Sequence, residues 1–98
     1  MLGEKLKELR ESKGLLQRQV AAELDLDTAY ISKMENNDKP VSKTYLSKLA
    51  AVYEVDEQDL ITLWLADKVY DIVKDQDMAL KAMGVVENEI KSKKRKSN

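Results

Sequence analysis

The feature that most constrains this chain is a three-residue break between two short amphipathic segments, inside the stretch VAAELDLDTAYISKMENN at 20–37. Apolar residues keep helical spacing before the break and resume it afterwards (Val20, Ala21 and Leu24, then Ile31 and Met34). Two helices joined by so short a turn cross steeply, at roughly 90–120°. Their backbones then come close, so the residue at the contact must be small, as Ala21 is. The pattern predicts a helix-turn-helix pair.

The rest of the chain is also expected to be helical, because it has one proline, three glycines and no alternating strand pattern. Leucines at helical spacing predict a first helix that starts at Leu2 and ends at Gly14. The second helix is expected at 16–24. Further helices are expected to start at four capping residues (Asp27, Ser42, Asp56 and Asp77). The tail KSKKRKSN at 91–98 has no apolar residue and is expected to be disordered.

The composition argues against an enzyme. The chain has neither histidine nor cysteine, which removes the commonest general base, the thiolate nucleophile and the commonest metal ligands. A glycine-rich phosphate loop is also missing, so no cofactor, metal or small-molecule ligand is expected. No apolar run approaches the roughly 18 residues of a membrane span, and the first residues do not form a signal peptide. We expect a soluble, cytoplasmic protein.

The charge is distributed unevenly, although the net charge is only −1. Residues 1–53 carry nine basic and eight acidic side chains, whereas residues 54–90 carry ten acidic side chains and three lysines. Residues 91–98 add five basic side chains. The amino-terminal half can therefore face phosphates, and the acidic stretch cannot.

The stretch from Leu2 to about Val55 resembles the Cro/C1-type (XRE-type) helix-turn-helix family, over more than half the chain and without a gap. The resemblance is carried by KLKELRESKGLLQRQVAAELDLDTAYISKMENN and by VSKTYLSKLAAVYEV. It implies a five-helix, phage-repressor-like DNA-binding domain at 1–55 in an all-α protein. Helical spacing past the match predicts a helical extension at 56–90. A looser resemblance links the chain to small regulators found beside restriction-modification genes.

The same resemblance implies a DNA-binding surface. Gln17 occupies the position where the family's glutamine binds a phosphate and supports the recognition helix at 28–35. Thr28, Ala29 and Lys33 occupy the base-reading positions, and their methyl groups and ammonium suit thymine methyls and guanine acceptors. Contacts to the DNA backbone or to flanking bases are implied for six more residues (Arg18, Tyr30, Ser32, Asn36, Lys39 and Lys43). A buried ion pair, Arg10 with Glu35, is implied between the first and third helices.

Plainer interpretations exist for several of these positions. Tyr30 can pack, Ser32 can bond back to its own helix, and Lys43 can simply be solvated. The chain also departs from the family pattern at five positions. Asp25 and Asn37 replace glycines, Leu16 replaces a polar cap, and Asp27 and Asp38 bring negative charge near the expected phosphates.

The segment DLITLWLADKVYDIV at 59–73 places apolar residues around more than one helix face. One side is expected to dock on the core through Leu60, Leu63 and Trp64. The other side is expected to form a homodimer interface (Leu65, Val69 and Ile72), unless the sixth helix covers it within the chain. Together with this dimer, the resemblance implies a transcriptional regulator, expected to be a repressor, that binds a palindromic operator in double-stranded DNA. The alternatives are an antitoxin-like protein and a protein-interaction module with weak or no DNA binding.

Overall fold

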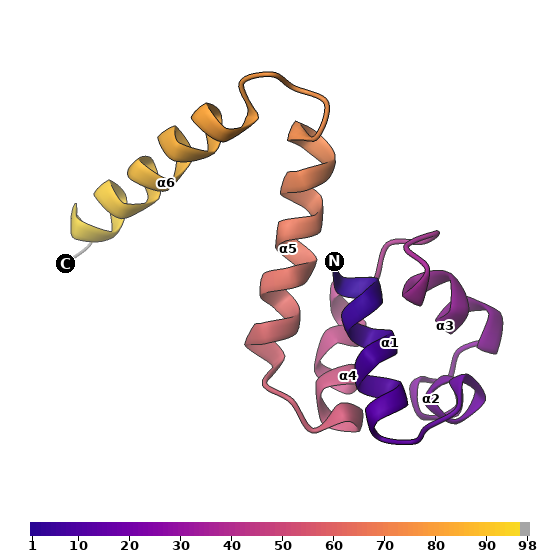
Figure 1. Ribbon diagram of the computed structural model, residues 1–98. Helices are drawn as coiled ribbons and strands as arrows, with labels where there is room; N and C mark the ends of the chain where they lie inside the picture. Colours follow the sequence, from indigo (N-terminus) through magenta and orange to yellow (C-terminus); the bar gives the residue numbers. More distant parts are fainter. Residues whose placement is uncertain (97–98) are drawn as a thin grey trace. The chain divides into compact units, whose positions relative to one another are not determined.

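The computed structural model describes residues 1–96 and divides the chain into two compact units, Met1–Lys68 and Val69–Asn98. Every regular element of the described residues is helical (Figure 1). The elements in chain order are α1 (Leu2–Ser12), α2 (Gln17–Leu24), α3 (Thr28–Glu35), the 3-10 helix η1 (Lys43–Tyr45), α4 (Leu46–Tyr53), α5 (Glu57–Val73) and α6 (Ala79–Lys96). The all-α prediction is confirmed.

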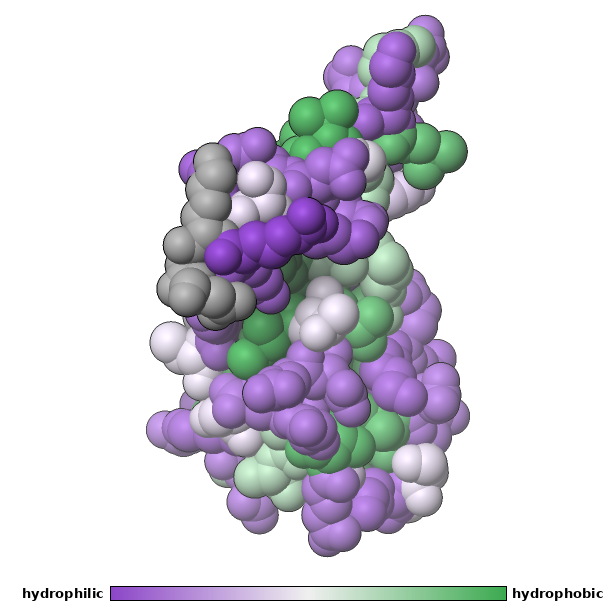
Figure 2. Space-filling model, turned by 90° about the vertical axis from the view of Figure 1, so that its left-hand side faces the viewer, coloured by the Kyte–Doolittle hydropathy of each residue, from purple (hydrophilic) through white to green (hydrophobic). Residues whose placement is uncertain are grey.

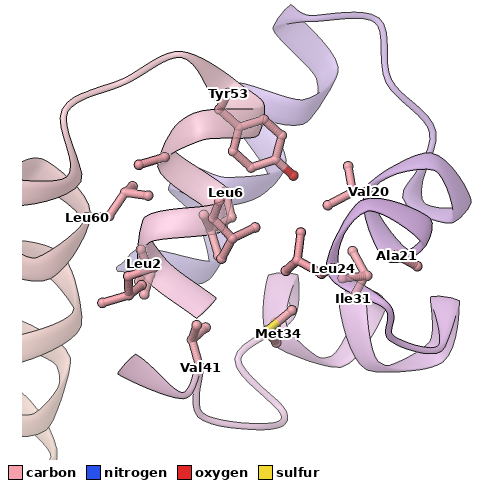
Figure 3. Packing of buried hydrophobic residues seen from close by; sticks show 13 residues of the cluster. Leu2, Leu6, Val20, Ala21, Leu24, Ile31, Met34, Val41, Tyr53 and Leu60 are labelled. Atoms are coloured by element: carbon pink, nitrogen blue, oxygen red, sulfur yellow. The ribbon is translucent and has the colours of Figure 1, made fainter. Parts of the chain in front are cut away.

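The core of the first unit is formed by the apolar faces of α1 to α5 (Figure 3). Thirteen hydrophobic side chains are buried in it (Leu2, Leu6, Val20, Ala21, Leu24, Ile31, Met34, Val41, Leu46, Leu49, Ala50, Tyr53 and Leu60). Each fully buried leucine stabilises the fold by about 1.5–3 kcal/mol relative to an exposed one. Ala21 and Ile31 lie where α2 meets α3, and Ala21 is 2% exposed. The small residue predicted for the helix crossing is therefore buried there.

Helices α1 to α4 end in the same way. A residue shortly after each helix has a positive φ: Gly14 at 67°, Asp25 at 56°, Asn37 at 61° and Glu54 at 55°. Each of these residues and its successor donate backbone hydrogen bonds back into the helix, which is the Schellman arrangement. Gly14 ends its helix as predicted, and Asp25 and Asn37 take the left-handed conformation that the family's glycines would supply. The left-handed conformation of Glu54 was not foreseen from the sequence.

The helix starts depart from several capping predictions. Asp56 acts as predicted, since its Oδ1 accepts the Gln58 N–H at 2.9 Å. Asp27 stands at the N-cap position of α3 but its side chain makes no capping bond. Ser42 pairs with the Thr44 hydroxyl at 3.0 Å instead and precedes η1 rather than α4.

Two further helix starts differ in detail. At α2, the Leu16 N–H donates to the Gln19 side chain at 2.7 Å, so Gln19 supplies half of a capping box that Leu16 cannot complete. At α6, the helix begins at Ala79, two residues after Asp77, and the Asp77 side chain makes no hydrogen bond within the described residues.

The second unit holds the end of α5 and all of α6. Helix α6 continues to Lys96, so residues 91–96, predicted as part of a disordered tail, are helical; residues 97–98 lie outside the described residues. The reason is that ion pairs of the i,i+4 type, Glu87 with Lys91 at 2.9 Å and Glu89 with Lys93 at 3.8 Å, support this part of the helix. Basic residues also favour the negative end of the helix dipole. Among the described residues, no helix has both the length and the apolar character that a bilayer crossing requires.

Candidate nucleic-acid interface

A buried carboxylate fixes the orientation of α3. The Glu35 side chain is 2% exposed and accepts hydrogen bonds from Arg10 Nε at 2.7 Å and Arg10 Nη2 at 3.1 Å. Arg10 Nη1 also donates to the Leu15 carbonyl at 2.9 Å, just beyond the end of α1. The hydrogen bonds to Glu35 raise the pKa of the Arg10 guanidinium above its ordinary value. The ion pair therefore ties α1 and the turn after it to the last residue of α3.

Gln17 adds α2 to the same cluster. Its side-chain Nε2 donates to Glu35 Oε1 at 3.1 Å, and the side chain is half-buried at the first turn of α2. The amide nitrogen carries two hydrogens, so one remains available to an outside acceptor. The structure thus brings Gln17, Arg10 and Glu35 together, and the three helices that carry them are held by one carboxylate.

The outer face of α3 is open. Thr28, Ala29 and Lys33 are exposed, while Ile31 and Met34 on the opposite face are each 2% exposed. None of the three exposed side chains makes a hydrogen bond or an ion pair to another described residue. This short face, with two methyl-bearing side chains and one ammonium, can enter a groove without giving up an internal contact.

The residues around this face are partly engaged within the protein. The Tyr30 ring packs edge-on against Tyr45, with centroids 6.2 Å apart, and Lys39 Nζ lies 5.7 Å from the Tyr30 ring centroid. The Asn36 amide lies 3.5 Å from the Ser32 hydroxyl, a long contact between neighbouring turns of one helix. Tyr30 therefore packs within the protein, as the plainer interpretation expected, whereas the Lys39 ammonium stays at the surface.

Trp64 anchors the segment that follows α3. Its indole Nε1 donates to the Val41 carbonyl at 2.7 Å, and the ammonium groups of Lys43 and Lys68 lie 5.8 Å and 4.6 Å from its ring centroid. Trp64 was predicted to lie against the core, which its partial burial confirms, but the bond to Val41 was missed. The sequence could indicate only that the indole N–H finds some acceptor, as a buried tryptophan usually does, and not that the acceptor is Val41.

The remaining predicted positions are Arg18 on α2 and three apolar residues of α5. Arg18 is exposed on α2. Leu65 and Ile72 on α5 are 53% and 74% exposed, and Val69 is half-buried. Hydrophobic residues, green in Figure 2, are open at the molecular surface. In the second unit, Val69, Ile72 and residues of α6 line a groove of about 820 Å³.

The first unit has the parts of a helix-turn-helix: α2, a left-handed turn at Asp25, and α3 with an exposed face. Residues 6–60 match the model of the helix-turn-helix family. The chain belongs to this family. The predicted membership is confirmed, and the family is one of DNA-binding transcription regulators. This membership indicates a regulator rather than an enzyme.

Three relatives of the helix-turn-helix unit carry regulatory names. The chain is 43% identical over 60 residues to the propionyl-CoA carboxylase regulator of Cereibacter sphaeroides, a match over 61% of this chain and 13% of that protein. It is 34% identical over 56 residues to the HTH-type transcriptional regulator PrpR of Mycobacterium tuberculosis, over 57% and 12%. It is 46% identical over 50 residues to the control protein C.MunI of a Mycoplasma species, over 50% and 68%. The matched region is thus a small part of the first two relatives.

One solved structure shares the fold along the whole chain. A chain of the SinR protein/SinI protein complex covers 100% of this chain and is itself covered completely, with a TM-score of 0.57. At 22% identity, this likeness establishes the fold alone.

Proposed function

We propose that this protein is a sequence-specific transcriptional regulator, acting as a repressor in the cytoplasm, that places α3 in the major groove of its operator. The observation that carries the proposal is the contrast between the two faces of α3. One face is fixed by the core and by the buried Glu35 carboxylate. The other presents Thr28, Ala29 and Lys33 with no internal partner among the described residues.

The side chains suggest how bases and phosphates are divided between them. The methyl groups of Thr28 and Ala29 can contact thymine methyls, and Lys33 can donate to guanine O6 and N7. Gln17, through its second amide hydrogen, and the lysines after α3 supply donors for phosphates, which position the protein without specifying sequence. Arg18, Ser32, Asn36, Lys39 and Lys43 form the edge of this surface.

A homodimer would let two copies of α3 read a palindromic site. One recognition helix reads few base pairs, whereas a two-fold pair reaches half-sites one helical turn apart, about 34 Å. The apolar groove of the second unit and the exposed Leu65 and Ile72 supply apolar surface for an isologous contact. A repressor would then act by occupying the operator.

The dimer is tested by sedimentation velocity at micromolar concentration. We expect a dimer for the wild type and a monomer for Leu65→Asp combined with Val69→Asp. Leu16→Asp is the matched control, because Leu16 is 49% exposed and lies outside the proposed interface. A wild-type monomer, with or without DNA, would contradict this part of the proposal.

DNA recognition is tested by selection from a pool of randomised duplexes. The wild type is expected to enrich a motif with two inverted half-sites. A Thr28→Asp/Lys33→Asp variant, which keeps the buried face of α3, is expected to enrich nothing. Sequencing that shows no enrichment by a folded wild-type protein would rule out sequence-specific binding.

The exposed apolar surface of the second unit favours two alternatives, a protein-interaction module without DNA binding and an antitoxin-like protein that binds both DNA and a protein partner. The solved structure that shares the fold is itself a complex of two proteins, SinR and SinI. A folded wild type that enriches no DNA would favour the protein-interaction module.

A further inference from the structure

The last turns of α6 carry four exposed basic side chains, which we call the basic end: Lys91, Lys93, Lys94 and Arg95. All four side chains are exposed, and no apolar residue follows Ile90. Lys91 and Lys93 pair with glutamates one turn earlier. Lys94 and Arg95 have no hydrogen bond or ion pair with another described residue, so their charges are available to an outside anion.

The helix-turn-helix unit has the opposite balance. Residues 1–68 contain ten basic and thirteen acidic side chains, and one of the basic ones, Arg10, is taken up by Glu35. A unit with a net negative charge gains little from the sequence-independent attraction to DNA, which depends on the number of phosphates neutralised. Cations outside this unit can therefore add an attraction to phosphates that its own net charge does not supply.

We propose that the basic end of α6 binds backbone phosphates of the same DNA whose bases α3 reads, an inference that rests on the proposed function. Arg95 and Lys94 make these contacts directly, and Lys91 adds to the local potential. The contacts are independent of sequence, so they raise affinity for all duplexes alike. The base-reading surface then needs to supply only the preference among sequences.

The chemistry of the basic end favours DNA over two other anionic partners. An amphipathic helix that binds a membrane surface inserts the apolar residues beside its cations, and the nearest ones here, Val86 and Ile90, line the groove of the second unit that is proposed above for the dimer contact. An acidic face of a second copy would draw the basic end into the dimer contact and remove it from DNA. The four cations also stabilise the carboxy-terminal end of α6 through the helix dipole. If that were their only role, replacing them would leave DNA affinity unchanged.

The test compares Lys94→Gln/Arg95→Gln with the wild type by fluorescence anisotropy on two labelled duplexes. One duplex has an arbitrary sequence and the other is the sequence that the wild type selects. Binding is measured between about 50 and 200 mM salt, and the slope of log K against log salt is expected to fall by about 1.8 for two lost contacts. The loss is expected on both duplexes, with base preference unchanged. Lys74→Gln/Lys81→Gln, which removes two positive charges from the same unit, is the control and is expected to keep the wild-type slope.

Three outcomes would overturn the proposal. The first is an unchanged salt slope in the Lys94→Gln/Arg95→Gln variant. This outcome counts against the proposal even if circular dichroism shows that the variant has lost helix, because the two side chains would then matter only for the length of α6. The second is an equal fall in the control, which would indicate a general charge effect. The third is conversion of the variant to a monomer by sedimentation, which would assign the basic end to assembly. If the wild type binds neither duplex, the proposed function itself fails, and the two failures are thus distinguishable.

Discussion

Replacing Arg10 with methionine should reveal how strongly the helix-turn-helix unit depends on one buried charge. In the wild type, Glu35 accepts two bonds from Arg10 and one from Gln17. Arg10→Met keeps the apolar length of the side chain but leaves Glu35, whose side chain is 2% exposed, with a single neutral donor. Breaking a buried pair in this way costs about 3–5 kcal/mol.

That loss is a large part of the free energy of unfolding of a small domain, about 5–15 kcal/mol. Each kcal/mol shifts the melting temperature of a domain of this size by about 4–8 °C, so we expect a fall of at least about 12 °C. The assay is thermal unfolding by circular dichroism at neutral pH. Arg10→Met/Glu35→Met should recover most of the loss, because it leaves no unpaired buried charge.

Lys13→Met is the matched control, because Lys13 also pairs with a glutamate from near the end of α1. That pair, to Glu54 at 3.2 Å, is exposed at 38% and 77%, so its removal should cost no more than about 1 kcal/mol. Equal melting temperatures for Arg10→Met and the wild type would refute the reasoning, as would an equal loss in the control.

Three further predictions concern backbone and core. Asp25→Gly should stabilise the protein by about 0.5–1 kcal/mol in urea unfolding, because Asp25 has a φ of 56° that glycine adopts without strain; a loss of stability would contradict this. Gly3→Ala should destabilise the protein by about 1–3 kcal/mol in the same assay, because an added Cβ would lie 2.7 Å from the carbonyl oxygens of Met34 and Glu35. An unchanged unfolding midpoint would contradict this, since it would show that α1 and α3 can separate at no cost. Burial raises the pKa of Tyr53 to about 12 from its ordinary 10.0, so the unfolded state ionises first and about 2–3 kcal/mol of stability should be lost between pH 10 and pH 12. In Tyr53→Phe, that alkaline loss should be smaller than in the wild type; equal losses would contradict the assignment.

The fold could be predicted because its main determinants are local. Leucine spacing in α1, the small Ala21 at the crossing and Gly14 after α1 each indicate structure from a few neighbouring residues. The left-handed Glu54 could not be anticipated, because glutamate has no preference for that conformation and the surrounding packing imposes it. The helical end of α6 was missed because a missing apolar face was taken as disorder, although ion pairs and the helix dipole support it.

The candidate site was less predictable than the fold. The resemblance pointed to Arg10, Glu35 and Gln17, but the hydrogen bond that adds Gln17 to the pair depends on how three helices meet. The bond from Trp64 to the Val41 carbonyl joins residues 23 positions apart, and no local pattern encodes it. Side chains without internal partners, such as Lys33, were identified by position, and their exposure became clear only from the packing of α3.

Major-groove recognition by α3 is tested most directly by the binding of Lys33→Ala to the selected operator and to duplexes with each base pair changed, at one fixed salt concentration. If α3 reads the groove, Lys33→Ala loses about 1–3 kcal/mol on the selected operator and no longer discriminates at one base pair in each half-site. Gln17→Ala, measured in parallel, should weaken binding to all duplexes alike while keeping that discrimination. Unchanged affinity and unchanged preference in Lys33→Ala would contradict the placement of α3 in the major groove.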